Sequence, residues 1–146
     1  MIIDADAHCD IPCGIYETGT ASTAAKTVAT LTKKILDLGS LPPADGNAGK
    51  QLEYENTIAR MVMVKEHHAQ LCKEQLLILW TDYFKPNHLQ TFPDLHDTFW
   101  KAAKLCSFCK QHVDLAKAEE LQKAVAGIAA MFDKAEAAKA KEAAKK

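Results

Sequence analysis

Residues 51–86, QLEYENTIARMVMVKEHHAQLCKEQLLILWTDYFKP, decide the fold of this chain. The apolar side chains of this stretch recur every three or four positions, the spacing that gathers side chains on one face of an α-helix. Lys85-Pro86 ends the pattern, because proline disfavours helical backbone in the residue before it. We therefore predict a long helix from about Leu52 to Phe84, whose apolar face consists of Ile58, Met61, Val62, Ala69, Cys72, Leu76, Leu79, Trp80 and Tyr83.

The same spacing occurs on the N-terminal side of this stretch. Apolar residues at helical intervals from Val28 to Leu38 predict a first helix, and Gly39 offers a C-terminal stop. Residues 39–49 are rich in proline and glycine and predict a loop.

Two more helices are predicted on the C-terminal side. Thr91-Phe92-Pro93-Asp94 has the composition of a helix start, with Thr91 as the N-cap and Pro93 in the first turn. Asp114 is expected to cap a fourth helix. The inward positions are Leu95, Phe99, Ala102, Cys106, Cys109 and Val113 in the third helix, and Leu115, Ala118, Leu121, Val125, Ile128 and Phe132 in the fourth.

Four amphipathic segments without any strand-like alternation predict an all-α fold, an antiparallel four-helix bundle. A metal-binding hook, residues 8–16, is expected at the N-terminus of the bundle. The bundle is expected at about residues 20–135. A polar tail at about residues 136–146 has no apolar face, so we expect it to fray or extend into solvent.

Composition restricts the class of protein. The chain has 146 residues, of which 48% are hydrophobic and 25% charged, as in a single globular domain. A net charge of -1 gives no electrostatic case for a nucleic-acid partner, and no apolar run approaches the roughly 20 residues that cross a bilayer. Five cysteines, an odd number, favour a reducing compartment. We expect a cytoplasmic protein with no membrane partner.

The N-terminal segment carries the chemistry. Residues 8–16, which we call the hook, read His8-Cys9-Asp10-Ile11-Pro12-Cys13-Gly14-Ile15-Tyr16. Two thiols and an imidazole this close in sequence can converge on one metal ion. Small residues at Ala5 and Ala7 indicate that a protease removes a leader of residues 1–7, which would give His8 a free amine.

After such a cleavage the hook offers a dense set of nitrogen and sulfur donors. The His8 amine, the Cys9 amide nitrogen and the thiolates of Cys9 and Cys13 form an N2S2 plane, and the His8 imidazole can approach from the axial side. This donor set favours Ni(II) or Cu(II), whereas zinc prefers a tetrahedron. Strongly donating thiolates and an amide anion would lower the potential of the Ni(III)/Ni(II) couple. The alternative is an N-terminal tail with two incidental cysteines.

Other cysteines and histidines are weaker candidates. Cys106 and Cys109 form a CxxC motif, but they fall on an apolar helical face and are expected to pack in the core. His68 and Cys72 lie four positions apart, which suits a metal, yet two ligands are too few for a structural site. Trp80 and Trp100 are expected to pack between helices.

The hook resembles the N-terminal segment of nickel-dependent superoxide dismutases. A second block agrees, Leu79-Trp80-Thr81-Asp82-Tyr83-Phe84-Lys85-Pro86 followed by Phe92-Pro93-Asp94-Leu95-His96, and the resemblance extends from His8 to about Phe132. It implies a four-helix bundle, a homohexamer and a dedicated protease that removes the leader. It also implies an antioxidant enzyme that disproportionates superoxide to oxygen and hydrogen peroxide at one nickel per subunit.

The resemblance implies a role for individual residues of the site. The nickel ligands would be His8, Cys9 and Cys13. Tyr16 and Tyr83 would line the approach of superoxide, and Asp10 would brace the hook through hydrogen bonds.

The resemblance also concerns the surroundings of the site. Lys73, Lys85 and Lys110 would form a positive rim that steers the anion inward. The family's glutamate and arginine that hold the axial imidazole correspond to Ala24 and His68 here, so neither of these two partners is available to hold His8.

Two other functions remain open from the sequence. A nickel or copper carrier could use the same hook without turnover, and a helical interaction protein would need no metal at all. Only the enzyme requires a protein-walled approach and reversible one-electron chemistry. While residues 1–7 are attached, the His8 nitrogen is an amide, so the intact chain is expected to be inactive and to bind nickel poorly.

Overall fold

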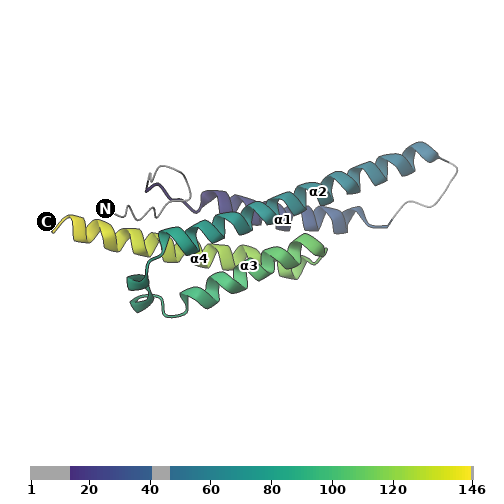
Figure 1. Ribbon diagram of the computed structural model, residues 1–146. Coiled ribbons are helices and arrows are strands. Elements are labelled where there is room, and N and C mark those ends of the chain that lie inside the picture. Colours follow the sequence, from purple (N-terminus) through teal and green to yellow (C-terminus); the bar gives the residue numbers. More distant parts are fainter. Residues whose placement is uncertain (1–13, 41–46, 146) are drawn as a thin grey trace, which may run out of the picture.

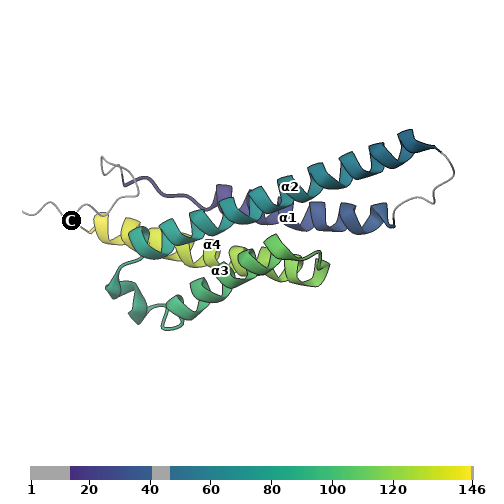
Figure 2. The ribbon, with the colours of Figure 1, turned by 45° about the vertical axis from the view of Figure 1, so that its right-hand side comes forward.

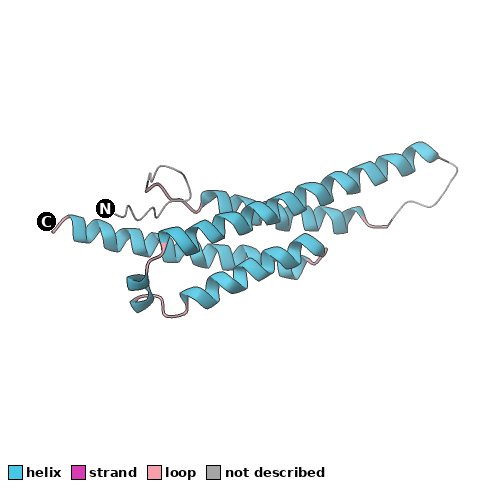
Figure 3. Cartoon of the chain, in the orientation of Figure 1, coloured by secondary structure: helices cyan, strands magenta, loops and turns pink. Residues whose placement is uncertain are grey.

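Four helices form an antiparallel bundle in the computed structural model, which describes residues 14–40 and 47–145 (Figure 1). They are α1 (Gly19–Leu38), α2 (Ala48–Ile78), α3 (Leu95–Gln111) and α4 (Leu115–Ala143). The described residues contain no strand (Figure 3). Each helix packs on the next one, and α1 packs on α4, so the predicted all-α four-helix bundle is confirmed.

The helices are staggered along the bundle axis. The α1–α2 hairpin extends past the α3–α4 turn at one end, and the C-terminal turns of α4 project at the other end (Figure 2). The described chain starts at Gly14 near this second end, where α2 finishes and the connection to α3 turns back (Figure 1). Segments far apart in the sequence therefore gather there.

Two predicted helix ends are confirmed. Gly39 has a φ of 71°, a left-handed conformation that favours glycine, and its N–H donates to the Leu36 carbonyl. The Asp114 carboxylate accepts a hydrogen bond of 3.0 Å from the Lys117 N–H at the start of α4.

The start of α3 differs from the prediction. Thr91 is not its N-cap, because α3 begins only at Leu95. Residues Pro86–Gln90 form a 3-10 helix, and the Thr91 N–H closes it by donating to the His88 carbonyl at 3.0 Å. Phe92 is buried, and its carbonyl accepts from the Leu95 N–H. The burial of this ring sets the path of the chain into α3, in place of the local capping signal.

The α2 helix is longer than predicted at its start. Asn47 caps it by accepting from the Lys50 N–H at 3.2 Å, so the helix includes residues that the glycine content had assigned to the loop. At its end the helix continues into a π-helical turn, Leu79–Tyr83, closed by a 3.0 Å hydrogen bond from the Phe84 N–H to the Leu79 carbonyl.

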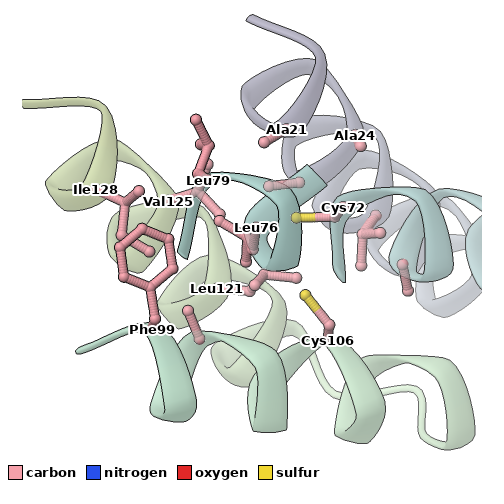
Figure 4. Close-up of a cluster of buried hydrophobic side chains, with 14 of the residues drawn as sticks. Ala21, Ala24, Cys72, Leu76, Leu79, Phe99, Cys106, Leu121, Val125 and Ile128 are labelled. Atoms are coloured by element: carbon pink, nitrogen blue, oxygen red, sulfur yellow. The ribbon is translucent and has the colours of Figure 1, made fainter. Parts of the chain in front are cut away.

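The core consists of apolar side chains from all four helices (Figure 4). Cys106 and Cys109 are buried in it, as predicted. Full burial of a leucine, isoleucine or phenylalanine side chain contributes about 1.5–3 kcal/mol. The residues labelled in Figure 4 are Ala21, Ala24, Cys72, Leu76, Leu79, Phe99, Cys106, Leu121, Val125 and Ile128.

Two residues predicted to be inside are exposed. Trp100 is 53% exposed, because its neighbour Phe99 takes the core position, and the Lys104 ammonium lies over its ring. Val113 is 43% exposed, because α3 already ends at Gln111. When the helical period is continued beyond the end of a helix, as at Val113, it wrongly assigns exposed residues to the core.

One buried polar side chain was not predicted. The Lys65 side chain of α2 is 1% exposed and donates to three carbonyls at the C-terminal end of α3, those of Cys109, Lys110 and His112. These carbonyls have no partners inside their own helix, so Lys65 completes the last turn of α3.

The predicted polar tail remains helical to Ala143. Most of its residues are exposed, as expected, but Glu136 is half-buried and contacts another element. No described helix has both the length and the apolar character needed to cross a membrane.

Candidate active site

The structure brings two predicted site residues together at the end of the bundle. Tyr16, just before α1, and Tyr83, in the π-helical turn, have ring centroids 5.4 Å apart at an interplanar angle of 60°. His8, Cys9, Asp10 and Cys13 lie outside the described residues.

A cavity of about 600 Å³ lies beside these tyrosines. Gly14, the first described residue, lines it with a φ of 68°, so the chain turns there in a conformation that favours glycine. Gly14 directly follows Cys13 in the sequence, so the described end of the hook lies at this cavity. The lining residues are Gly14, Tyr16, Asp82, Tyr83, Lys85, Asn87, His88, Gln90, Thr91, Phe92, Lys134, Ala135, Ala138, Lys139 and Glu142.

Aromatic rings hold Tyr83 in the wall of the cavity. Its ring centroid lies 4.5 Å from that of Phe132 on α4, 4.9 Å from that of Phe84 and 5.9 Å from that of His88. Its hydroxyl donates a 2.8 Å hydrogen bond to Glu136 Oε1. Burial raises the pKa of the Tyr83 hydroxyl well above its usual range, and the hydrogen bond to Glu136 and the negative charge of that carboxylate raise it further.

The rest of the second sequence block ties the π-helical turn to α3. The Trp80 indole N–H donates to His96 Nδ1 at 2.9 Å, and the indole stacks on Phe99 with centroids 6.1 Å apart. Trp80 does not line the cavity.

Only one of the three lysines expected at the rim lines the cavity. This is Lys85. The other two connect α2 to α3: Lys73 Nζ donates to Ser107 Oγ at 3.0 Å, and Lys110 Nζ donates to Gln70 Oε1 at 3.1 Å.

Two lysines of α4 that sequence reasoning had missed also line the cavity, Lys134 and Lys139. Lys139 belongs to the polar tail predicted at about residues 136–146, and Lys134 lies just before that tail. No local pattern distinguishes them from the other lysines of α4.

The positions aligned with the family's glutamate and arginine have other roles. Ala24 is a core residue that is 1% exposed. His68 Nδ1 lies 2.9 Å from the carbonyl oxygen of Val64 on the same helix. Ala24 and His68 therefore do not form a carboxylate–guanidinium pair like the glutamate and arginine of the family.

The described residues do not supply a metal site by themselves. They contain no group of three or more histidine, cysteine, aspartate or glutamate residues that could hold an ion. Cys72 of α2 and Cys106 of α3 are both buried in the core (Figure 4). The neighbouring Cys72 thiol and burial raise the pKa of the Cys106 thiol. Burial raises the pKa of Cys109 to about 11. A metal ion needs thiolates, so these buried thiols are poor ligands.

Comparisons with known proteins agree with this arrangement. The family described as nickel-containing superoxide dismutase matches residues 3–136. The chain is 32% identical over 130 residues to a nickel superoxide dismutase of Streptomyces seoulensis, covering 89% of this chain and 88% of that protein. It is 31% identical to the corresponding protein of Streptomyces coelicolor, with the same coverage.

Solved structures show the same fold. A native nickel superoxide dismutase superposes with a TM-score of 0.72 at 29% identity, covering 88% of this chain and 99% of that one. A second structure, with nickel ligation of the oxidised state, gives a TM-score of 0.71 at 31% identity over 88% of this chain and 98% of that one.

The fold and these relatives define a metal-dependent oxidoreductase built on a helical bundle, with the cavity lined by Tyr16 and Tyr83 at one end of it. More particularly, the chain belongs to the nickel-containing superoxide dismutases. It is therefore an enzyme that acts on superoxide and uses nickel, which favours this function over the carrier and over the metal-free interaction protein.

Proposed function

We propose that His8, Cys9 and Cys13 hold the nickel ion, one per subunit, at the mouth of the cavity beside Tyr16 and Tyr83. The donor set supports this, because two thiolates, an imidazole, an amine and an amide nitrogen are donors that would suit a nickel ion. When bound, nickel supplies a centre that changes oxidation state by one electron, as the disproportionation of superoxide to oxygen and hydrogen peroxide requires. The observation that carries the proposal is the position of Gly14, next to Cys13, at the cavity.

Proteolytic removal of residues 1–7 belongs to the same proposal. Cleavage after Ala7 turns the His8 nitrogen from an amide into an amine, which can donate its lone pair. A dedicated processing protease is the partner that this step requires.

The residues of the cavity control access to the centre. Tyr16 and Tyr83 narrow the approach with their facing rings. Lys85, together with lysines of α4, offers positive charge to an anionic substrate. Asp10 braces the hook through hydrogen bonds in this proposal.

The assembly and location are proposals of the same kind. Large apolar side chains of α2 remain exposed in the single chain, Leu52 and Met63 each at 65%, which supports a subunit interface in a homohexamer. Free thiols at Cys72, Cys106 and Cys109 support a reducing, cytoplasmic location. The mass of the protein in solution, by sedimentation, tests the hexamer, and a monomer would contradict it.

The ligand set is tested on a chain trimmed to start at His8 and loaded with nickel. We expect stoichiometric nickel, a rhombic Ni(III) signal with nitrogen hyperfine splitting in electron paramagnetic resonance, and removal of superoxide. Cys9→Ser and Cys13→Ser should abolish all three, whereas Cys109→Ser, which changes a buried core thiol, should retain stoichiometric nickel. A trimmed chain that retains nickel and activity after Cys9→Ser would contradict the proposal.

The intact chain is the matched comparison for leader removal. With residues 1–7 still attached, we expect little nickel and no dismutase activity. High activity of a chain whose intact mass is verified by mass spectrometry would show that the amine of His8 is not needed.

A further inference from the structure

Glu136 is a carboxylate that is hydrogen-bonded to the wall of the cavity. Its Oε1 accepts the hydrogen of the Tyr83 hydroxyl at 2.8 Å. The side chain is 42% exposed and lies 3.6 Å from Lys139 Nζ. Glu136 itself does not line the cavity, so any effect it has on substrate acts through Tyr83.

The register of α4 presents two side chains to Tyr83 at once. Phe132 and Glu136 are related as i and i+4, and such pairs lie on the same face of a helix. Phe132 packs on the ring of Tyr83, with centroids 4.5 Å apart, and Glu136 binds the hydroxyl at the end of that ring. One face of α4 therefore determines both the plane of the ring and the direction of its hydrogen.

We propose that Glu136 is a positioning residue for superoxide dismutation, which holds the Tyr83 hydroxyl in place and keeps it protonated at the wall of the superoxide approach. The inference rests on the proposed role of Tyr83 in that approach. Nothing in the resemblance to the family implied Glu136, which lies in the stretch that the sequence presented as a polar tail.

The physical reason is the sign of the charges. A phenolate in the wall would repel an anionic substrate. A carboxylate next to a phenol opposes formation of the phenolate, because two like charges would lie within hydrogen-bond distance, and the hydrogen bond itself favours the protonated phenol. The pKa of Tyr83 is raised by burial first and by Glu136 next. Glu136 thus extends the range of pH over which the wall stays neutral.

Other charged groups surround the site, and the test must separate them from Glu136. The causes of the raised pKa of Tyr83 are burial and Glu136, with no contribution from a lysine or from a second carboxylate. The charged or titratable side chains that share the cavity with Tyr83 are Tyr16, Asp82, Lys85, His88, Lys134, Lys139 and Glu142.

The first measurement is the ionisation of Tyr83 in the full-length, metal-free chain. The chain has three tyrosines, so labelling their Cζ carbons with carbon-13 gives three resonances, and Tyr83→Phe identifies the one that matters. In Glu136→Gln, the amide still accepts a hydrogen bond but has no charge. We expect the ionisation of Tyr83 to begin about one pH unit lower than in the unsubstituted chain, whose hydroxyl should stay protonated beyond the ordinary tyrosine pKa of about 10.

Glu142→Gln is the matched control for this measurement. It makes the same change of charge on the same helix, at a residue that lines the same cavity but does not bond Tyr83. We expect it to leave the ionisation of Tyr83 unchanged. If Glu136→Gln also leaves it unchanged, or if both substitutions shift it equally, Glu136 is not a positioning residue.

The second measurement is the pH dependence of dismutation by the trimmed, nickel-loaded enzyme. The rate is expected to fall at alkaline pH, and we call this fall the alkaline limb. In Glu136→Gln the alkaline limb should move to lower pH by the same amount as the ionisation of Tyr83. Glu119→Gln, on α4 and away from the cavity, should leave the limb in place. A shifted ionisation with an unmoved limb would overturn the role in catalysis. Absence of dismutation in the unsubstituted loaded enzyme would instead count against the proposed ligand set.

Discussion

Adjacent aromatic residues on α3 have opposite environments. Phe99 is 0% exposed and contacts Trp80 and Phe84, whereas Trp100 is 53% exposed. We expect Phe99→Ala to lower the free energy of unfolding by about 3–5 kcal/mol, because it removes a buried ring and leaves a cavity. Trp100→Ala is the control and should cost less than about 1 kcal/mol. Urea denaturation of both variants checks this, and equal losses would contradict the assignment of Phe99 to the core.

Lys65 is a second case in which one side chain has a definite structural task. Its ammonium is surrounded by three carbonyl oxygens at the negative end of the α3 dipole. We expect Lys65→Met to lower the free energy of unfolding by about 2 kcal/mol, since part-buried carbonyls lose their partner while a desolvated charge is removed. Hydrogen exchange of the last turn of α3 should rise in the same variant. An unchanged exchange rate there would show that Lys65 does not cap the helix.

At the scale of the element, the start of α4 depends on one cap. Asp114 accepts from the Lys117 N–H, so Asp114→Ala should lower the free energy of unfolding by about 1 kcal/mol. Asp133→Ala is the matched control, because Asp133 is an exposed residue in the middle of the same helix. That substitution should be neutral or slightly stabilising, since alanine has the better helix propensity. Thermal unfolding followed by circular dichroism measures both, and an equal loss in both variants would contradict the cap.

At the scale of the whole molecule, charge is distributed unevenly. The net charge is only -1, yet one cavity is lined by three lysines, Lys85, Lys134 and Lys139, against two carboxylates, Asp82 and Glu142. Such a local positive field speeds the approach of an anion and weakens as salt screens it, over a Debye length of about 10 Å at 0.1 M. We expect the second-order rate with superoxide to fall as ionic strength rises.

Substitution of Lys134 tests the source of this field. Lys134→Gln should reduce both the rate and its dependence on salt, whereas Lys123→Gln, on the same helix but away from the cavity, should change neither. Stopped-flow decay of superoxide measures the rates. Equal salt dependence in the two variants would show that the cavity lysines do not steer the substrate.

Local sequence was enough to predict most of the helices, and it is also the basis of the proposed donors for nickel. The helical period marks an apolar face wherever a helix lies, so Leu76, Phe99 and Leu121 were all assigned correctly to the core. The hook concentrates its donors within a few positions, which is a property of the sequence alone. The predicted helix start at Thr91 was wrong, because burial of Phe92 outweighed the local capping signal.

The side chains that surround the site could not be predicted from local sequence. By itself the sequence determined an all-α bundle and predicts a metal-binding N-terminus, because periodicity and ligand spacing are local properties. Only the tertiary structure brought Tyr16 to Tyr83 and Tyr83 to Glu136. These contacts join the N-terminal segment, the end of α2 and the last turns of α4. Their geometry depends on the stagger of the packed helices, which is a property of the whole core and of no single segment.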